Sequence, residues 1–212
     1  MTAYKLTDEN GKTRGNTQWG PGVTHEAAGN GELCSKGWIH VYSYPLLAVF
    51  LNPIHANFQH PRLWRCEVGG RHRDDRGLKH GWQRVTTVEE IELPVVTMEQ
   101  RVRFGILCAL HVAPPAPWCE WARKWLSSAD RSRAAALAAL DAAWGWSAHP
   151  PSGARAASAS AARACAVAAS MEASRDAAWA VAAAAEASRD AARARSAPRL
   201  DLIALAEKAV RE

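Results

Sequence analysis

Cysteine and histidine recur at one matched spacing in the first third of the chain. Two Cys-x5-His pairs share it: Cys34, His40, Cys66 and His72. An even offset along an extended strand places both members of a pair on the same face of a sheet. Two thiolates and two imidazoles satisfy tetrahedral zinc, and Cys108 and His111 are further candidate ligands. The alternative is buried thiols with hydrogen-bonded histidines. We favour this alternative, which predicts no metal cofactor.

A second group combines aromatic rings with basic or titratable side chains in the first strands of the chain. Its members are Tyr4, Lys5, Trp19, His25, Trp38, His40 and Tyr42. If these strands close into a curved sheet, rings can stack on a base or sugar while lysine or histidine meets phosphate. The spacing equally allows alternate residues to form core and ordinary surface. The group therefore predicts either a site for an anionic or nucleotide-like ligand or a plain hydrophobic core.

Several catalytic signatures are absent. Gly11-Lys12-Thr13 matches the end of a phosphate-binding loop, but Leu6 stands where that loop requires glycine. The chain holds no GxGxxG, GxSxG or HExxH motif. These absences exclude dinucleotide-binding, serine-hydrolase and zincin sites of the usual type.

Composition and charge set further limits. The chain has 212 residues, of which 22% are charged and 48% hydrophobic, so it is expected to fold. The net charge of +5 is spread along the chain, with 13 Lys and Arg against 11 Asp and Glu up to residue 112. Nucleic-acid binding is therefore unsupported. The locally basic stretch 62–84 is expected to be a solvated loop.

Cysteine usage and hydropathy bear on location. Five cysteines without a CxxC pair favour reduced thiols and a bacterial cytoplasm. The first residues lack the apolar stretch of a signal peptide, and the longest apolar run, 46–51, is too short to cross a bilayer. We therefore expect no membrane association.

Residues 4–94 read as short strands separated by turns. Asn10-Gly11 predicts a type I′ hairpin turn. Strands are expected at 37–42, 62–68 and 84–93, with a short helix over 45–51 that starts at a proline.

Helical patterns follow. Thr97 and Gln100 have the spacing of a capping box, which predicts a helix from Met98 to Leu110. Beyond the proline-rich run 113–117, two amphipathic helices are expected to pack their large side chains inward: Trp118, Trp121 and Trp125 in the first, and Leu137, Leu140 and Trp144 in the second.

Alanine dominates the remainder, with six alanines before residue 113 and 38 from residue 113 onward. Residues 154–195 contain no Gly or Pro, and EASRDAA occurs twice in them at an offset of two heptads. A seam of small residues then follows the heptad, which predicts a long helix that self-associates as a coiled coil. A frayed helical tail is the alternative. A last amphipathic helix carries Leu202, Leu205 and Val210.

These patterns predict an α+β protein in three parts. A small β-rich N-terminal module with a short helix and a closing helix spans 1–112. Trp-rich amphipathic helices occupy 113–153, and the Ala-rich long helix plus the terminal amphipathic helix occupy 154–212.

Residues 1–112 carry a resemblance. Three features carry it: Tyr4-Lys5, the cluster formed by Cys34, Gly37, Trp38 and His40, and the strand end Glu67-Val68-Gly69. Together they resemble the N-terminal domain of a family of small phage and prophage proteins of unknown function. Ile39 is an extra residue relative to the commoner Gly-Phe-His form. The resemblance implies a phage-type origin and a module found with varied tails, and it implies no activity.

The order of elements is also loosely similar to ADP-ribosyltransferase-like folds, which bind NAD between two small sheets. The similarity places the catalytic positions at Lys5, at Tyr42 or Tyr44, and at Glu89, Glu90 or Glu92, with His40 nearby. Such enzymes have Arg or His where this chain has Lys5. Whether the protein is an enzyme is left open.

Three functions follow from these patterns. The first is a phage-type accessory protein whose β-rich module binds an anionic ligand, a nucleotide-like ligand, or a host or phage protein. The others are an NAD-consuming transferase and a small zinc-stabilised structural protein.

Overall fold

The computed structural model describes residues 1–111, 114–147 and 200–211. It separates into two units, Met1–Val95 and Val96–Glu212. Helices occur together with an antiparallel sheet, so the predicted α+β class is confirmed. The division lies ahead of the helix that was expected to close the first module at residue 112, and this helix belongs to the second unit.

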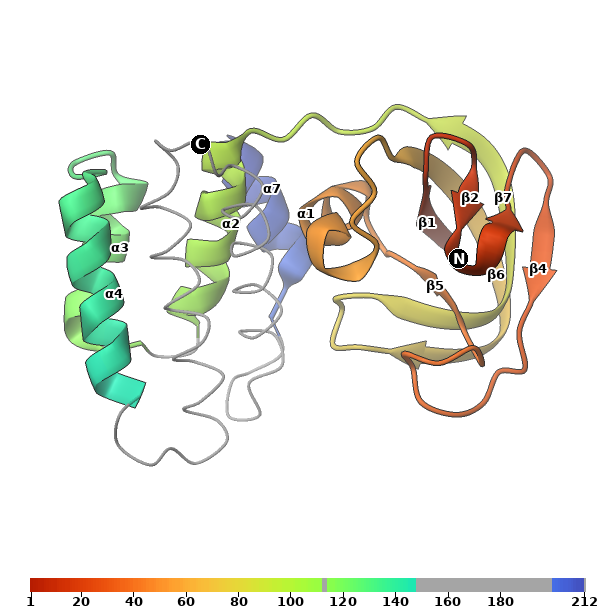
Figure 1. Ribbon diagram of the computed structural model, residues 1–212, viewed down its shortest axis with the longest axis horizontal. Coiled ribbons are helices and arrows are strands. Elements are labelled where there is room, and N and C mark those ends of the chain that lie inside the picture. Colours follow the sequence, from red (N-terminus) through yellow and green to blue (C-terminus); the bar gives the residue numbers. More distant parts are fainter. Residues whose placement is uncertain (112–113, 148–199, 212) are drawn as a thin grey trace. The chain divides into compact units, whose positions relative to one another are not determined.

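The N-terminal unit is built on one five-stranded antiparallel sheet (Figure 1). The main path runs in the order β1 (Thr2–Thr7), β6 (Arg62–Asp74), β7 (His80–Ile91) and β4 (Thr24–Glu26), and β5 (Ile39–Val41) also pairs with β7. A separate two-stranded ribbon joins β2 (Lys12–Thr13) to β3 (Thr17–Gln18) through the short 3-10 helix η1 (Arg14–Asn16).

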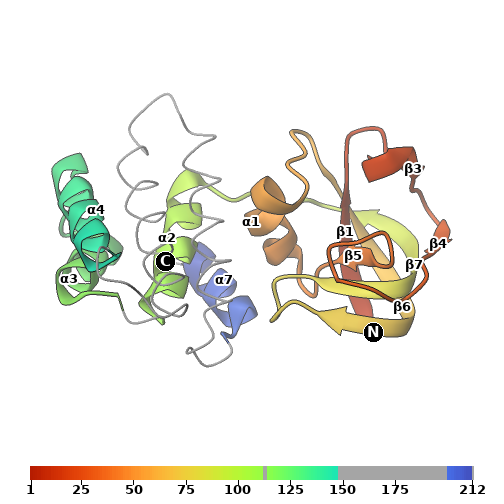
Figure 2. The same cartoon turned by 60° about the horizontal axis from the view of Figure 1, so that its bottom comes forward.

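One backbone bridge brings the two sides of this sheet together. Tyr4 N–H donates to the Tyr42 carbonyl at 2.8 Å, and Tyr42 N–H donates to the Tyr4 carbonyl at 2.7 Å. Because β5 already pairs with β7, the path from β1 through β6, β7 and β5 returns to β1 (Figure 2). The sheet is therefore strongly curved, as the interpretation of the aromatic group required.

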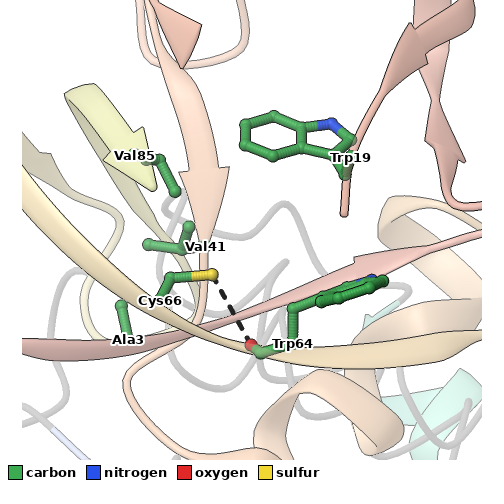
Figure 3. Close-up of a cluster of buried hydrophobic side chains, with 6 residues drawn as sticks. All are labelled: Ala3, Trp19, Val41, Trp64, Cys66 and Val85. Atoms are coloured by element: carbon green, nitrogen blue, oxygen red, sulfur yellow. Dashed lines mark hydrogen bonds between the residues drawn. The ribbon is translucent and has the colours of Figure 1, made fainter. Parts of the chain in front are cut away.

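The interior of the curved sheet holds a compact apolar cluster (Figure 3). Its members come from β1, β5, β6, β7 and the segment after β3: Ala3, Trp19, Val41, Trp64, Cys66 and Val85. Trp64 Nε1 donates to Thr7 Oγ1 at 3.1 Å, and Cys66 Sγ donates to the Trp64 carbonyl at 3.5 Å. The two indoles supply most of the buried area, since each tryptophan buries about 150–250 Å².

The basic stretch 62–84 is not a solvated loop, contrary to the sequence prediction. β6 and β7 are longer than expected and pair as far as Asp74 and His80. The register shifts between Gly69 and His72, and a bulge there lets the hairpin bend and continue. Gly70 has a φ of +79°, and a Cβ on it would lie 2.8 Å from Gln83 Oε1, so this bulge position requires glycine.

The predicted type I′ turn is also wrong in its geometry. Of Asn10 and Gly11, only Gly11 has a positive φ, at +75°. The Asp8 carboxylate instead organises the turn by accepting hydrogen bonds from the N–H groups of Asn10 and Lys12, at 2.9 and 2.7 Å. An aspartate that bonds its own following backbone stabilises a turn without two left-handed residues.

Helix α1 (Pro45–His55) begins at the predicted proline but runs four residues past the predicted end. Its buried residues stop at Leu51, so the apolar pattern underestimated the helix. Asn52 secures the last turn, because its side chain donates to the Phe58 carbonyl at 2.9 Å and accepts from Phe58 N–H at 3.1 Å.

The second unit contains α2 (Met98–Leu110), α3 (Ala116–Leu126), α4 (Arg133–Ser147) and α7 (Leu202–Arg211). The capping box at the start of α2 is confirmed: Thr97 Oγ1 accepts from Gln100 N–H at 3.2 Å, and Thr97 N–H donates to Gln100 Oε1 at 2.9 Å. Gln100 Nε2 also donates to the Val210 carbonyl at 3.1 Å, which links α2 to α7. None of the helices described here has the length and apolarity needed to span a membrane.

The predicted buried face is confirmed in α3 but not in α4. In α3, Trp118, Trp121 and Trp125 are buried as predicted. In α4, Leu137 and Trp144 are exposed, Leu140 is half-buried, and the buried positions are alanines: Ala136, Ala139 and Ala143. The predicted inward face of α4 is therefore wrong. Alanine permits close approach to α3, the helix that α4 contacts, whose buried face is formed by bulky indoles.

The predictions for the Ala-rich segment lie outside the described residues. These are the helix-breaking stretch 149–153 with its prolines and glycine, the long helix over 154–195 and its self-associating seam. In α7, Leu202 is buried as expected, while Leu205 and Val210 are half-buried beside the buried Ala206 and Ala209.

Candidate functional site

A lysine lies in the interior of the curved sheet. Lys5 is 7% exposed. Its Nζ donates to the His40 carbonyl at 3.1 Å and lies 4.5 Å from the centroid of the Trp19 ring. No carboxylate of the described residues forms an ion pair with it. Lysine is rarely buried without an anionic partner, so this position calls for an explanation beyond packing.

Burial changes the acidity of the two titratable groups in this interior. Removal from water lowers the pKa of Lys5 to about 8 and raises the pKa of the Cys66 thiol to about 12. The thiol is therefore neutral at pH 7, while the amine is close to losing its proton. Such an amine can donate hydrogen bonds or act as a nucleophile once it is deprotonated.

The other predicted ligand-binding residues partly gather around Lys5. His25 meets the edge of the Trp19 ring with centroids 4.5 Å apart, and its Nε2 lies 2.8 Å from the Gln18 carbonyl oxygen. His40 reaches Lys5 only through its carbonyl, because its ring bonds the Leu33 carbonyl. Burial is the main reason that the pKa of His40 is lowered.

Three further members of that group have structural contacts. Tyr4 and Tyr42 form the bridge that closes the sheet, and the Tyr42 hydroxyl bonds His55 Nδ1 at 3.1 Å. Burial raises the pKa of Tyr42. Trp38 is buried and donates from Nε1 to the Gly31 carbonyl at 3.1 Å.

The carboxylates named by the transferase similarity do not meet Lys5. Glu90 is paired with Arg62, and Glu89 is paired with Arg65 at 2.7 Å. Both pairs are exposed, and the hydrogen bond from Arg62 lowers the pKa of Glu90. The remaining positions are Glu92, which is exposed just beyond β7, and Tyr44, which precedes α1. These contacts bring no lysine and carboxylate together.

The four residues proposed for zinc occupy separate environments. Cys34 is exposed and accepts a hydrogen bond from Lys79 Nζ at 3.3 Å, whereas Cys66 is in the apolar cluster. The ring of His40 bonds Leu33, and His72 bonds a second histidine, His80. In the described part of the chain, no three or more His, Cys, Asp or Glu side chains are placed to hold a metal ion.

A second cluster lies on the far half of the β6–β7 hairpin, in 69–74 and 80–84, which we term the distal hairpin. His72 stacks on Trp82 with ring centroids 4.3 Å apart, and its Nε2 is 2.9 Å from His80 Nδ1. The arginines of the same hairpin are exposed: Arg71, Arg73 and Arg84. These cations, with His72 and His80 among them, were expected in a solvated loop, and Trp82 was missed. The β-branched and aromatic residues of 80–91 were the signal that these positions extend a strand.

The chain matches no family model, no curated protein and no solved structure. The buried lysine and the distal hairpin are thus the two features on which a function can be built. Of these two, only the distal hairpin presents its charged groups to solvent.

Proposed function

We propose that this chain is a phage-type accessory protein whose N-terminal unit is a binding module for a phosphate-bearing, nucleotide-like ligand. The binding surface is the distal hairpin. The observation that carries this proposal is the set of exposed, loosely paired arginines on the hairpin that also carries the stacked rings of His72 and Trp82.

The pairing of the arginines changes along the hairpin. Near the start of β6, Arg65 is held by Glu89 at 2.7 Å. On the distal hairpin, Arg73 is 3.9 Å from Glu32 and Arg84 is 4.0 Å from Glu26, and all four side chains are at least half exposed. Pairs of this kind contribute little stability, so an anion can replace the carboxylates at small cost.

Arg71 adds a third cation. Its guanidinium has no hydrogen-bonded or ion-paired partner among the described residues, and only its backbone N–H is engaged, with Gln83 Oε1 at 3.2 Å. Guanidinium groups bind phosphate with two parallel hydrogen bonds. A phosphate group bound here would gain charge-assisted bonds without breaking a strong internal pair.

The aromatic pair gives the site a reason to prefer a nucleotide over inorganic phosphate. The His72 ring is exposed, and its face is supported by Trp82 at an interplanar angle of 29°. A base or sugar stacked on such a platform contributes about 1–3 kcal/mol. The imidazole would then contact the base or sugar of the ligand.

The test is thermal unfolding of the full chain with ATP, ADP-ribose, NAD and inorganic phosphate at low salt. A ligand present at about 100 times its dissociation constant stabilises the fold by about 2.7 kcal/mol. We expect stabilisation by the nucleotides that falls with added salt, because exposed charges are screened.

The variant Arg71→Ala/Arg73→Ala should weaken nucleotide binding at least about tenfold, since it removes two charge-assisted contacts. The matched control is Arg14→Ala, which removes an exposed arginine from η1 and should leave binding unchanged. If no compound in the panel stabilises the protein, or if Arg14→Ala weakens binding equally, the proposal is wrong.

A further inference from the structure

Two histidines of the distal hairpin direct ring nitrogens at each other. His72 Nε2, from β6, is 2.9 Å from His80 Nδ1, from β7. The two rings are nearly parallel, at 20°, with centroids 5.2 Å apart. Because a neutral imidazole has one donor and one acceptor nitrogen, a single proton lies between these two atoms. Two nitrogens that share a proton can instead share a metal ion.

The neighbouring strand positions hold both rings in place. Trp82 is directly opposite His72 in the ladder and stacks on it, while Asp74 is directly opposite His80. Asp74 Oδ1 is 3.6 Å from His80 Nδ1 and accepts a hydrogen bond from Gly77 N–H at 2.7 Å. The carboxylate therefore adds negative charge beside the two nitrogens, on the scaffold of a paired hairpin.

We propose that His72 and His80 form a two-histidine site for a divalent transition metal of the Zn²⁺ class. Zn–N bonds of 2.0–2.1 Å at a tetrahedral angle separate the two nitrogens by about 3.3 Å, so the rings need to move apart by only about 0.4 Å. Waters complete the coordination, because the described residues gather no group of three metal-ligating side chains. Asp74, with Oδ1 3.6 Å from the ligating Nδ1, is then placed to accept a hydrogen bond from a metal-bound water.

Access and donor chemistry agree with this assignment. His72 is exposed, so an ion can reach the pair from solvent, while His80 is only 8% exposed and holds its ring in one orientation. Imidazole nitrogen suits Zn²⁺, Cu²⁺ and Ni²⁺, whereas Mg²⁺ and Ca²⁺ prefer oxygen ligands. The inference does not depend on nucleotide binding, and it uses none of Cys34, His40 or Cys66.

The test is calorimetric titration of the full chain with ZnCl₂ and with MgCl₂, in buffer free of phosphate and nucleotide. We expect one Zn²⁺ per chain and no heat from Mg²⁺. His72→Ala and His80→Ala should each weaken Zn²⁺ binding more than tenfold, and Asp74→Asn should weaken it about tenfold, within the range for partners that orient metal ligands. His60→Ala, which removes an exposed histidine elsewhere, should bind as the unchanged protein does.

Histidine-ring NMR covers the case in which His80→Ala does not fold. Zn²⁺ should shift the ring signals of both His72 and His80 in the unchanged protein. Absence of Zn²⁺ binding, full binding by His72→Ala, or shifts confined to one ring would each overturn the site. Nucleotide binding measured without metal reports on the proposed function separately.

Discussion

Lys5 Nζ lies 4.5 Å from the centroid of the Trp19 ring, inside the apolar cluster of the N-terminal unit. The aromatic face and the His40 carbonyl are the groups that stabilise the ammonium, and neither carries a full negative charge. The buried charge therefore lowers the stability of the folded protein, because the ammonium loses the hydration that it has in the unfolded chain.

Replacement of Lys5 by methionine should stabilise the protein. A pKa of about 8 in place of 10.5 corresponds to a penalty of about 3 kcal/mol for the charged form at pH 7. Methionine fills a similar volume without a charge, so Lys5→Met should raise the free energy of unfolding by about 1–3 kcal/mol in urea denaturation. Lys36→Met, at an exposed position, should change it by less than about 0.5 kcal/mol.

The same lysine predicts a pH dependence with a defined sign. Between pH 8 and 10.5 the unfolded chain binds the Lys5 proton and the folded protein does not, so the contribution of Lys5 to the free energy of unfolding rises with pH in that window. Below pH 8 the full penalty is present. The stability gap between Lys5→Met and the unchanged protein should therefore shrink from pH 7 to pH 10, and a gap that stays constant or grows would contradict the assigned pKa.

Gly37 should tolerate no side chain, because a Cβ there would lie 1.9 Å from the Asn30 carbonyl oxygen. Its own carbonyl accepts from Gly29 N–H at 2.8 Å, so the segment cannot shift without losing that bond. Gly37→Ala should cost at least about 3 kcal/mol, the upper end for overpacking. A Cβ at Gly22 would meet no atom within 4 Å, so Gly22→Ala should lower the free energy of unfolding by only about 1 kcal/mol, because of the φ of +74° there. Equal costs in thermal unfolding would refute the steric argument.

Loss of the α2 cap should destabilise the second unit. Thr97→Ala removes the acceptor for Gln100 N–H and should cost about 1 kcal/mol, measured by circular dichroism during thermal unfolding. Thr97→Ser keeps the hydroxyl and serves as the matched control. A Thr97→Ser variant as unstable as Thr97→Ala would show that the methyl group, and not the cap, is responsible.

The inward face of α4 can be tested by two opposite substitutions. Leu137 is 41% exposed, so Leu137→Ala should cost less than about 1 kcal/mol. Ala143 is fully buried, so Ala143→Leu should cost about 1–3 kcal/mol through overpacking. The sequence pattern alone predicts the larger loss of stability for Leu137→Ala. Urea denaturation of the two variants therefore distinguishes an inward face of alanines from one of leucines.

Features that depend on a few neighbouring residues were predictable from the sequence. The cap of α2 needs only Thr97 and Gln100, and the start of α1 needs only the missing N–H of Pro45. The buried indoles of α3 follow from helical periodicity. In each case the determining contacts lie within two turns of one segment, so the local pattern contained the necessary information.

The candidate sites depended on contacts between distant segments. Lys5 is buried because Tyr4 and Tyr42, 38 positions apart, close the sheet over it. A bulge that let β6 and β7 pair to their ends brought His72 to His80, and the indoles of α3 favoured alanine on the buried face of α4. A pattern of hydrophobic and charged residues indicates which residues favour burial. Which of them are buried depends on the shape of the surface against which the segment packs.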